Sequence, residues 1–320
     1  MLFKNFLMWM IMVTIFITIS SNFFFIFWMM MEINLLMFIP VMNFMKTNNS
    51  NCMISYFVIQ SFSSTLFLIS ITYHFMYNIN IFELLIMISL MIKLGMIPFH
   101  FWITNLSEMF NYLLLLLILT IQKIIPLFIM TFINNKLFIM FSMISSIFGT
   151  AFLYNLKSLK KILIFSSISH LGWMTTLILL KSTFWFSYMM IYSFLIMKIT
   201  NIFKKYNLNL MNNFYMLNKN NFNKISTISL MLSLGGMPPF LGFIMKFISI
   251  LIILNKNSLI MMILIISSMM NIFIYIRMIY PYLFYNTMSI NVYLFLKLNL
   301  KGLILNLNLM ISVFFLNLLN

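Results

Sequence analysis

The stretch "SLMIKLGMIPFHFW", residues 89–102, sets a cation and two helix-breaking residues inside an apolar run. Lys93 lies in the middle of the run, and Gly95 and Pro98 follow it at once. Proline lacks a backbone N–H and its ring clashes with the preceding turn, so it interrupts a helix. The stretch "LGGMPPFLGF", residues 234–243, has the same character, and a lysine follows it. The sequence therefore predicts two broken helices, each beside a lysine.

The rest of the chain is as apolar as these two stretches. Of 320 residues, 63% are hydrophobic and 7% are charged, and the mean hydropathy is +1.08. A soluble domain needs many more charged residues to cover its surface. Apolar runs of about twenty residues recur throughout, so we predict an all-α integral membrane protein with about eleven transmembrane helices. The predicted spans are 5–21, 23–45, 52–77, 81–102, 112–131, 137–154, 160–180, 184–203, 225–254, 258–282 and 300–318.

The loops indicate the domain organisation and the orientation. The longest polar stretch, 204–224, is a loop, and we interpret residues 1–320 as a single polytopic membrane domain. Of the 19 Lys and Arg residues, twelve fall on the side of the N-terminus and three on the opposite side. The positive-inside rule then sets the N-terminus in the matrix and the C-terminus in the intermembrane space, if the membrane is that of a mitochondrion. The cations are scattered among short loops, which argues against nucleic-acid binding.

The amino-acid usage indicates where the gene resides. Phe and Met number 38 and 35, whereas alanine occurs once and aspartate never. Residues with A/T-rich codons are thus abundant, which is typical of an animal mitochondrial genome. The single cysteine, Cys52, excludes an intrachain disulfide and an iron–sulfur cluster with cysteine ligands. We expect no metal site and no cofactor in this chain.

The predicted breaks concentrate residues that the chain otherwise rarely uses. Four of the seven glycines and three of the six prolines lie there: Gly95, Gly235, Gly236, Gly242, Pro98, Pro238 and Pro239. Irregular backbone at membrane depth is tolerated only against protein or water. Gly/Pro-interrupted helices in corresponding parts of a chain are typical of transporters built from inverted repeats. We therefore predict an antiporter-like arrangement with a transport path between the breaks.

Four ionisable residues share one depth in the predicted spans: Glu32, Lys93, Lys123 and Lys246. Each lies ~14–16 Å into a hydrocarbon layer ~30 Å thick. A charged group at that depth costs at least ~2.5–3.5 kcal/mol, so four such groups on separate helices indicate a function. The alternative without a function is that each lysine extends to the lipid headgroups, but a lysine stem is too short to reach them from the midplane. Lys198 lies close enough to a span end to do so.

Other polar residues offer further candidates for the path. Ser166 and His170, in "KKILIFSSISHLGWM" (160–174), share a helix face four residues apart. Histidine both donates and accepts hydrogen bonds, so this pair is either a stepping stone between the lysines or a buried structural contact. For His100, just beyond the first break, we expect only a capping role.

Five stretches together resemble chain 2 of the mitochondrial NADH–ubiquinone oxidoreductases, a family of antiporter-like membrane subunits of respiratory complex I. They are "FFIFWMMMEINLLMFIPV" (24–41), "KLGMIPFHFW" (93–102), "LLLLLILTIQKIIP" (113–126), "KKILIFSSISHLGWM" (160–174) and "LSLGGMPPFLGFIMKF" (232–247). They follow the family's order, and eleven spans are what its animal members have.

The resemblance implies a role for each ionisable residue. Glu32 corresponds to the glutamate that pairs with the lysine of the first broken helix, Lys93. Lys123 corresponds to the central relay lysine, and Lys246 to the terminal lysine of the second broken helix. The sequence departs from the family's Gly, Trp, Pro and Trp at Met30, Ile121, Met245 and Phe247.

The implied activity is proton translocation in NADH:ubiquinone reductase, coupled to electron transfer in other subunits. NADH, FMN, iron–sulfur clusters and ubiquinone are expected in those subunits, and chain 4, the small chain 4L, accessory subunits and phospholipids such as cardiolipin are the expected partners. The resemblance also implies the mitochondrial inner membrane. Two alternatives stay open, a stand-alone cation/proton antiporter and a purely structural membrane subunit.

Overall fold

The computed structural model describes residues 2–45, 50–77, 80–133, 135, 137–211, 213, 221–238 and 240–284. Two sequence predictions, the span 300–318 and the helix-breaking role of Pro239, lie outside these residues. The described chain is helical, apart from one isolated bridge between Ser158 and Leu210. The predicted all-α class is therefore confirmed.

Helices with these bounds follow one another along the chain: α1 (Leu2–Ser20), α2 (Phe24–Phe44), α3 (Ser50–Tyr77), α4 (Asn80–Leu94), α5 (Phe101–Leu106), α6 (Tyr112–Leu119), α7 (Ile121–Met130), α8 (Phe138–Leu153), α9 (Leu159–Leu179), α10 (Phe184–Lys205), α11 (Asn221–Gly235), α12 (Leu241–Leu254) and α13 (Ser258–Phe284). Many serine and threonine hydroxyls bond a carbonyl one turn earlier, as Thr14 does to Ile11 at 2.7 Å. A hydroxyl thus finds its partner within its own helix, where lipid offers none.

The observed helices match the ten predicted spans that fall on the described residues. The predicted span 81–102 consists of α4 and α5, and 225–254 consists of α11 and α12, so both expected breaks are present. The span 112–131 is also interrupted, between α6 and α7 at Thr120, which was predicted as continuous. Its backbone is distorted from ideal helical values there, with φ −118° and ψ −78°.

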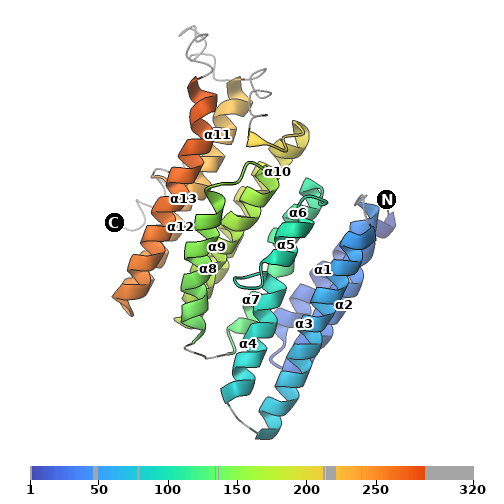
Figure 1. The fold of residues 1–320 in the computed structure, drawn as a ribbon. Coiled ribbons are helices and arrows are strands. Elements are labelled where there is room, and N and C mark those ends of the chain that lie inside the picture. Colours follow the sequence, from blue (N-terminus) through green and yellow to red (C-terminus); the bar gives the residue numbers. More distant parts are fainter. Residues whose placement is uncertain are drawn as a thin grey trace.

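The helices form two neighbouring groups (Figure 1). α1, α2 and α3 pack in sequence at one edge, with α4 and α7 beside them, and α8 to α13 make up the other group. α9 contacts helices of both groups, including α5, α6, α7, α8, α10, α12 and α13. Its side chains are buried on every face. A helix without an exposed face marks the centre of a large assembly of helices, and α9 carries Ser166 and His170.

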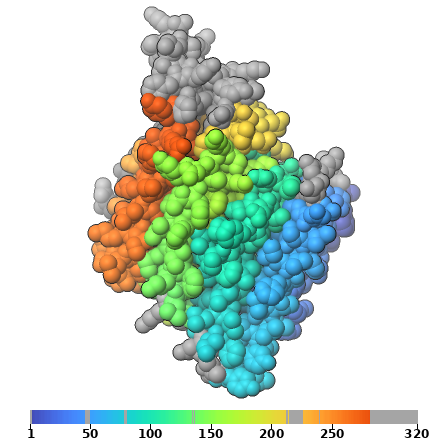
Figure 2. All heavy atoms as spheres, in the orientation of Figure 1, coloured from blue at the N-terminus to red at the C-terminus, as the bar shows by residue number. Residues whose placement is uncertain are grey.

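The outer surface is apolar, as a membrane protein requires. Figure 2 shows neighbouring helices packed side by side across one face. Large hydrophobic side chains are exposed on the outer helices, among them Trp9, Phe16, Phe25, Phe62, Met140, Met190, Met262 and Met269. Among the described residues, 7 helices are long and apolar enough to cross a membrane. The chain is a multi-pass membrane protein, while its interpretation as one domain stays a prediction.

Candidate functional site

The first halves of both predicted broken helices end in the same hydrogen-bond motif. At the end of α4, Gly95 N donates to Ile92 O and Met96 N to Met91 O. At the end of α11, Gly236 N donates to Ser233 O and Met237 N to Leu232 O. This pair of bonds defines a Schellman motif, which needs a residue in the left-handed conformation. Gly95 (φ 66°) and Gly236 (φ 88°) supply it, and Pro98 and Pro238 follow in the turns.

In each break, a side chain from beyond the interruption bonds a carbonyl of the first half. Trp102 Nε1, on α5, donates to Ile92 O of α4 at 3.0 Å. Lys246 Nζ, on α12, donates to Gly235 O of α11 at 2.6 Å. Interrupted helices leave carbonyl groups with few intrahelical partners. Lys246 donates to one of them, and Trp102 adds a second donor to Ile92 O, which also accepts from Gly95 N. The two breaks are thus built alike, although their lysines lie on opposite sides of the interruption.

Lys123 lies in the first turn of α7, three residues after the break at Thr120. The Thr120 hydroxyl donates to Leu116 O at 2.7 Å, and Lys123 N bonds Thr120 O at 3.1 Å, one residue short of the helical pattern. Pro126 lies about one turn further along α7 and has no N–H to donate to the carbonyl of Gln122. Threonine back-bonding and a nearby proline together bend helices, which accounts for the interruption.

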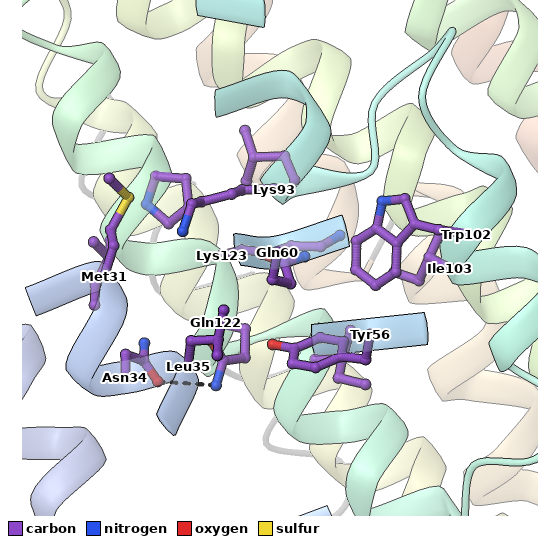
Figure 3. Close-up of a pocket in the computed structure, with 14 residues that line it drawn as sticks. Met31, Asn34, Leu35, Tyr56, Gln60, Lys93, Trp102, Ile103, Gln122 and Lys123 are labelled. Atoms are coloured by element: carbon purple, nitrogen blue, oxygen red, sulfur yellow. Dashed lines mark hydrogen bonds between the residues drawn. The ribbon is translucent and has the colours of Figure 1, made fainter. Parts of the chain in front are cut away.

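Lys93 and Lys123 line one cavity (Figure 3). The space that water could occupy amounts to about 20 Å³, room for about one water molecule, and it is bounded by α2, α3, α4, α5, α6 and α7. Its lining includes the polar side chains of Asn34, Gln60 and Gln122. Gln122 Nε2 donates to Asn34 Oδ1 at 3.0 Å, the bond drawn in Figure 3. The two predicted relay lysines therefore meet in a polar environment at the first break.

Glu32 lies on α2 between Met31 and Asn34, two residues that line the cavity. Its carboxylate accepts a hydrogen bond from the Ser64 hydroxyl of α3. It interacts electrostatically with Lys93, but the two do not form a direct ion pair. Among the described residues, the one direct ion pair joins Lys161 and Glu108, near the start of α9. The expected Glu32–Lys93 pairing is thus a through-space interaction in this conformation.

Lys246 and His170 lie in the second group of helices. Lys246 is buried, with 4% of its surface exposed, and its stem passes over Gly236. His170, 1% exposed, contacts the Tyr188 hydroxyl through Nδ1 at 2.8 Å. It lies within electrostatic reach of both Lys123 and Lys246. His170 is therefore near a lysine of each broken or interrupted span, and Ser166 is buried one turn away on the same helix.

Two further polar residues from the sequence analysis, Lys198 and His100, have different surroundings. Lys198 is exposed on α10 and its Nζ lies 5.3 Å from the centre of the Phe194 ring. The His100 Nδ1 lies 3.2 Å from Pro98 O, inside the first break. Among the described residues, no three His, Cys, Asp or Glu side chains group as metal ligands.

Sequence reasoning missed the amides of the first cavity. Gln60 and Gln122 are the only two glutamines in 320 residues, and both line the cavity with the two lysines. Their rarity within apolar spans was the available signal. Trp102, whose indole caps α4, gave no such signal because tryptophan is common in membrane helices.

Comparisons with known proteins identify the family of the chain. The family described as NADH:quinone oxidoreductase/Mrp antiporter matches residues 20–274. NADH-ubiquinone oxidoreductase chain 2 of Rhipicephalus sanguineus is 43% identical, over 88% of this chain and 90% of that protein. The protein of the same name from Anopheles gambiae is 36% identical, over 82% of this chain and 81% of that protein.

Solved structures share the fold at low identity. A chain of respiratory complex I from Thermus thermophilus has a TM-score of 0.74 and 15% identity, covering 86% of this chain and 69% of that one. A chain of the Mrp complex from Dietzia sp. has a TM-score of 0.74 and 15% identity, covering 85% and 59%. These likenesses confirm the antiporter-like fold class. The chain belongs to the family of membrane subunits shared by NADH:quinone oxidoreductases and Mrp antiporters, and its curated relatives are chain 2 of NADH-ubiquinone oxidoreductase.

Proposed function

We propose that the chain is a core membrane subunit of a proton-pumping NADH:ubiquinone oxidoreductase. It carries protons across the membrane through Glu32, Lys93, Lys123, His170 and Lys246, with Ser166 as a neighbour of the histidine. Electron transfer takes place in other subunits, which hold NADH, FMN, iron–sulfur clusters and ubiquinone. The chain itself holds no cofactor. The curated chain 2 relatives and the family match support this assignment.

The observation that carries the proposal is the meeting of Lys93 and Lys123 in one polar cavity beside a helix break. The two lysines come from different helices, and the cavity supplies amide oxygens that accept hydrogen bonds from water or from ammonium. Buried charges in a membrane are expensive unless they serve transport. The arrangement therefore favours proton transfer over a purely structural role.

The first step is the release of the Lys93 proton, which depends on the charge and position of Glu32. Burial disfavours a lysine ammonium, and a nearby carboxylate favours it. With Glu32 ionised and close, Lys93 keeps its proton. When Glu32 is protonated or moves away, Lys93 releases the proton through the cavity to Lys123. His170 then passes it toward Lys246, because it interacts with both lysines. A change of ~1.4 kcal/mol in the lysine environment shifts each equilibrium tenfold.

The proposal includes the setting of the subunit. It lies in the mitochondrial inner membrane with the N-terminus in the matrix and the C-terminus in the intermembrane space. Its neighbours are the membrane chains 4 and 4L and accessory subunits. Cations on one side of the bundle, such as Lys157, Lys204 and Lys205, suit the headgroups of phospholipids such as cardiolipin.

The test is the Lys123→Met variant in the assembled complex. Methionine keeps the length and apolar packing of the stem but carries no proton, so assembly is expected to persist. The number of protons pumped per electron, measured in vesicles with purified complex, is expected to fall, and coupled quinone reduction with it. Lys198→Met is the matched control, because that lysine is exposed and lies outside the row.

An unchanged proton-to-electron ratio in Lys123→Met would refute the relay. The structural alternative makes a wider prediction, namely that Glu32→Gln and Lys93→Met are also silent once assembly is verified. A loss of pumping in the assembled variants therefore separates the two.

A stand-alone cation/proton antiporter is the second candidate, favoured by the shared fold with a chain of the Mrp complex. This alternative predicts proton flux through the isolated chain in vesicles under a sodium or potassium gradient. The subunit hypothesis predicts no flux until the chain is assembled with its partners.

A further inference from the structure

Trp102 lies at the first break but has no place in the proposed relay. It is the second residue of α5, and 9% of its surface is exposed. Its side chain lines the first cavity together with Lys93 and Lys123 (Figure 3). An indole does not titrate, and its nitrogen is only a hydrogen-bond donor. Any role of Trp102 in proton transfer therefore has to act through the residues that it contacts.

One hydrogen bond ties Trp102 to the backbone that carries Lys93. Trp102 Nε1 donates to Ile92 O at 3.0 Å, across the break. The Ile92 carbonyl and the Lys93 N–H belong to the same planar peptide group. A donor that holds this carbonyl therefore also restricts the direction in which the Lys93 side chain leaves the backbone. Gly95 N donates to the same carbonyl at 3.2 Å, so the peptide group is held by two donors.

The indole ring is itself held in place by its packing. An added Cβ at Gly95 would lie 3.5 Å from Cζ2 and 3.6 Å from Cε2 of Trp102, so the turn closes directly against the ring. The Tyr56 ring of α3 also packs against the indole, with centroids 5.9 Å apart and an angle of 60° between the rings. Trp102 therefore connects α5 to the end of α4 and to α3.

The second break shows what the indole replaces. There the lysine itself donates to the freed carbonyl, because Lys246 Nζ bonds Gly235 O. At the first break a neutral indole donates to the corresponding carbonyl, at the negative end of the α4 dipole. Among the described residues, Lys93 has no direct hydrogen bond or ion pair. The Lys93 ammonium is thus not committed to the backbone, while its own peptide group is fixed.

We propose that Trp102 is a positioning residue for proton transfer at Lys93. Its N–H fixes the peptide group of Lys93, and its ring fixes the turn at Gly95. The Lys93 side chain therefore starts from one orientation, within electrostatic range of Glu32 and in the same cavity as Lys123. Trp102 exchanges no proton itself. The inference rests on the proposed function, because it assigns a role within the same relay.

The test compares Trp102→Phe with Trp102→His in the assembled complex. Phenylalanine keeps an aromatic ring but removes the N–H, whereas histidine keeps both a ring and an N–H donor. The number of protons pumped per electron is expected to fall in Trp102→Phe and to stay close to wild type in Trp102→His. Trp173→Phe is the matched control, because Trp173 is fully buried and its Nε1 has no hydrogen-bond partner in the described part of the chain.

A double variant separates positioning of Lys93 from a general loss of structure. If Trp102 acts through Lys93, then Trp102→Phe has no further effect on the proton-to-electron ratio once Lys93 is replaced by methionine. The ratio of the double variant is then expected to equal that of Lys93→Met alone. A merely structural role predicts losses that add, because the two changes would act independently.

An unchanged ratio in assembled Trp102→Phe would overturn the inference, as would equal losses in Trp102→Phe and Trp102→His or additive losses in the double variant. If Trp102→Phe does not assemble, a density map of the wild-type complex decides. Trp102 Nε1 beyond hydrogen-bonding distance of Ile92 O would then contradict the proposal, and a bond at that place together with normal pumping in Trp102→His would support it. Failure of the relay itself is recognised separately, by normal pumping in Lys93→Met and Lys123→Met.

Discussion

Lys246 is held by backbone rather than by a carboxylate. Its ammonium donates to Gly235 O at 2.6 Å, and its stem fills the space that a Cβ at Gly236 would need. An added Cβ would lie 2.8 Å from Lys246 Cδ and 2.9 Å from Nζ. The carbonyls freed by a broken helix carry the negative end of its dipole, which favours a cation there. One glycine therefore permits both the turn and the position of the charge.

Gly236→Ala tests this dependence. A residue with a side chain in the left-handed conformation costs about 1–2 kcal/mol, and the methyl group displaces the Lys246 stem. We expect the free energy of unfolding to fall by about 1–2 kcal/mol in the assembled complex. We also expect the number of protons pumped per electron to fall. Both are measurable on purified complex. Wild-type values for both would show that the close approach of Gly236 and Lys246 does not matter.

Three interruptions shape the helices that carry the lysines, and they differ in how well the sequence predicts them. Two contain glycine and proline, and their Schellman motifs follow from local chemistry. The third, at Thr120, contains neither residue at the break. There a hydroxyl–carbonyl bond to Leu116 and the missing N–H of Pro126 act from either side. Such bends depend on rotamers and packing, which local sequence patterns do not determine.

Gly242→Ala tests the packing of the second broken helix. An added Cβ at Gly242 would overlap Ser233 O, so α11 and α12 would have to separate. Overpacking of this kind costs about 1–3 kcal/mol or more. Native gels should show less assembled complex, whereas Ser193→Thr, which adds a methyl group on the exposed face of α10, should leave the amount unchanged. Equal amounts in both variants would contradict the close contact.

At the scale of the whole molecule, α9 joins two groups of helices and brings His170 within electrostatic range of both Lys123 and Lys246. The sequence predicts the depth of these residues from span lengths, and it predicts the helical class from composition. It does not predict which helices are neighbours, because apolar faces in lipid carry no mark of their partner. The first cavity, with Gln60 and Gln122, therefore emerged only from the three-dimensional arrangement.

A map of ordered water in the assembled complex, at a resolution that shows individual molecules, tests the proton relay. The relay requires water that joins Lys93 to Lys123 in the first cavity, and further water that leads by way of His170 to Lys246. Apolar side chains packed without water between Lys123 and His170, or lysine side chains directed at lipid, would contradict it.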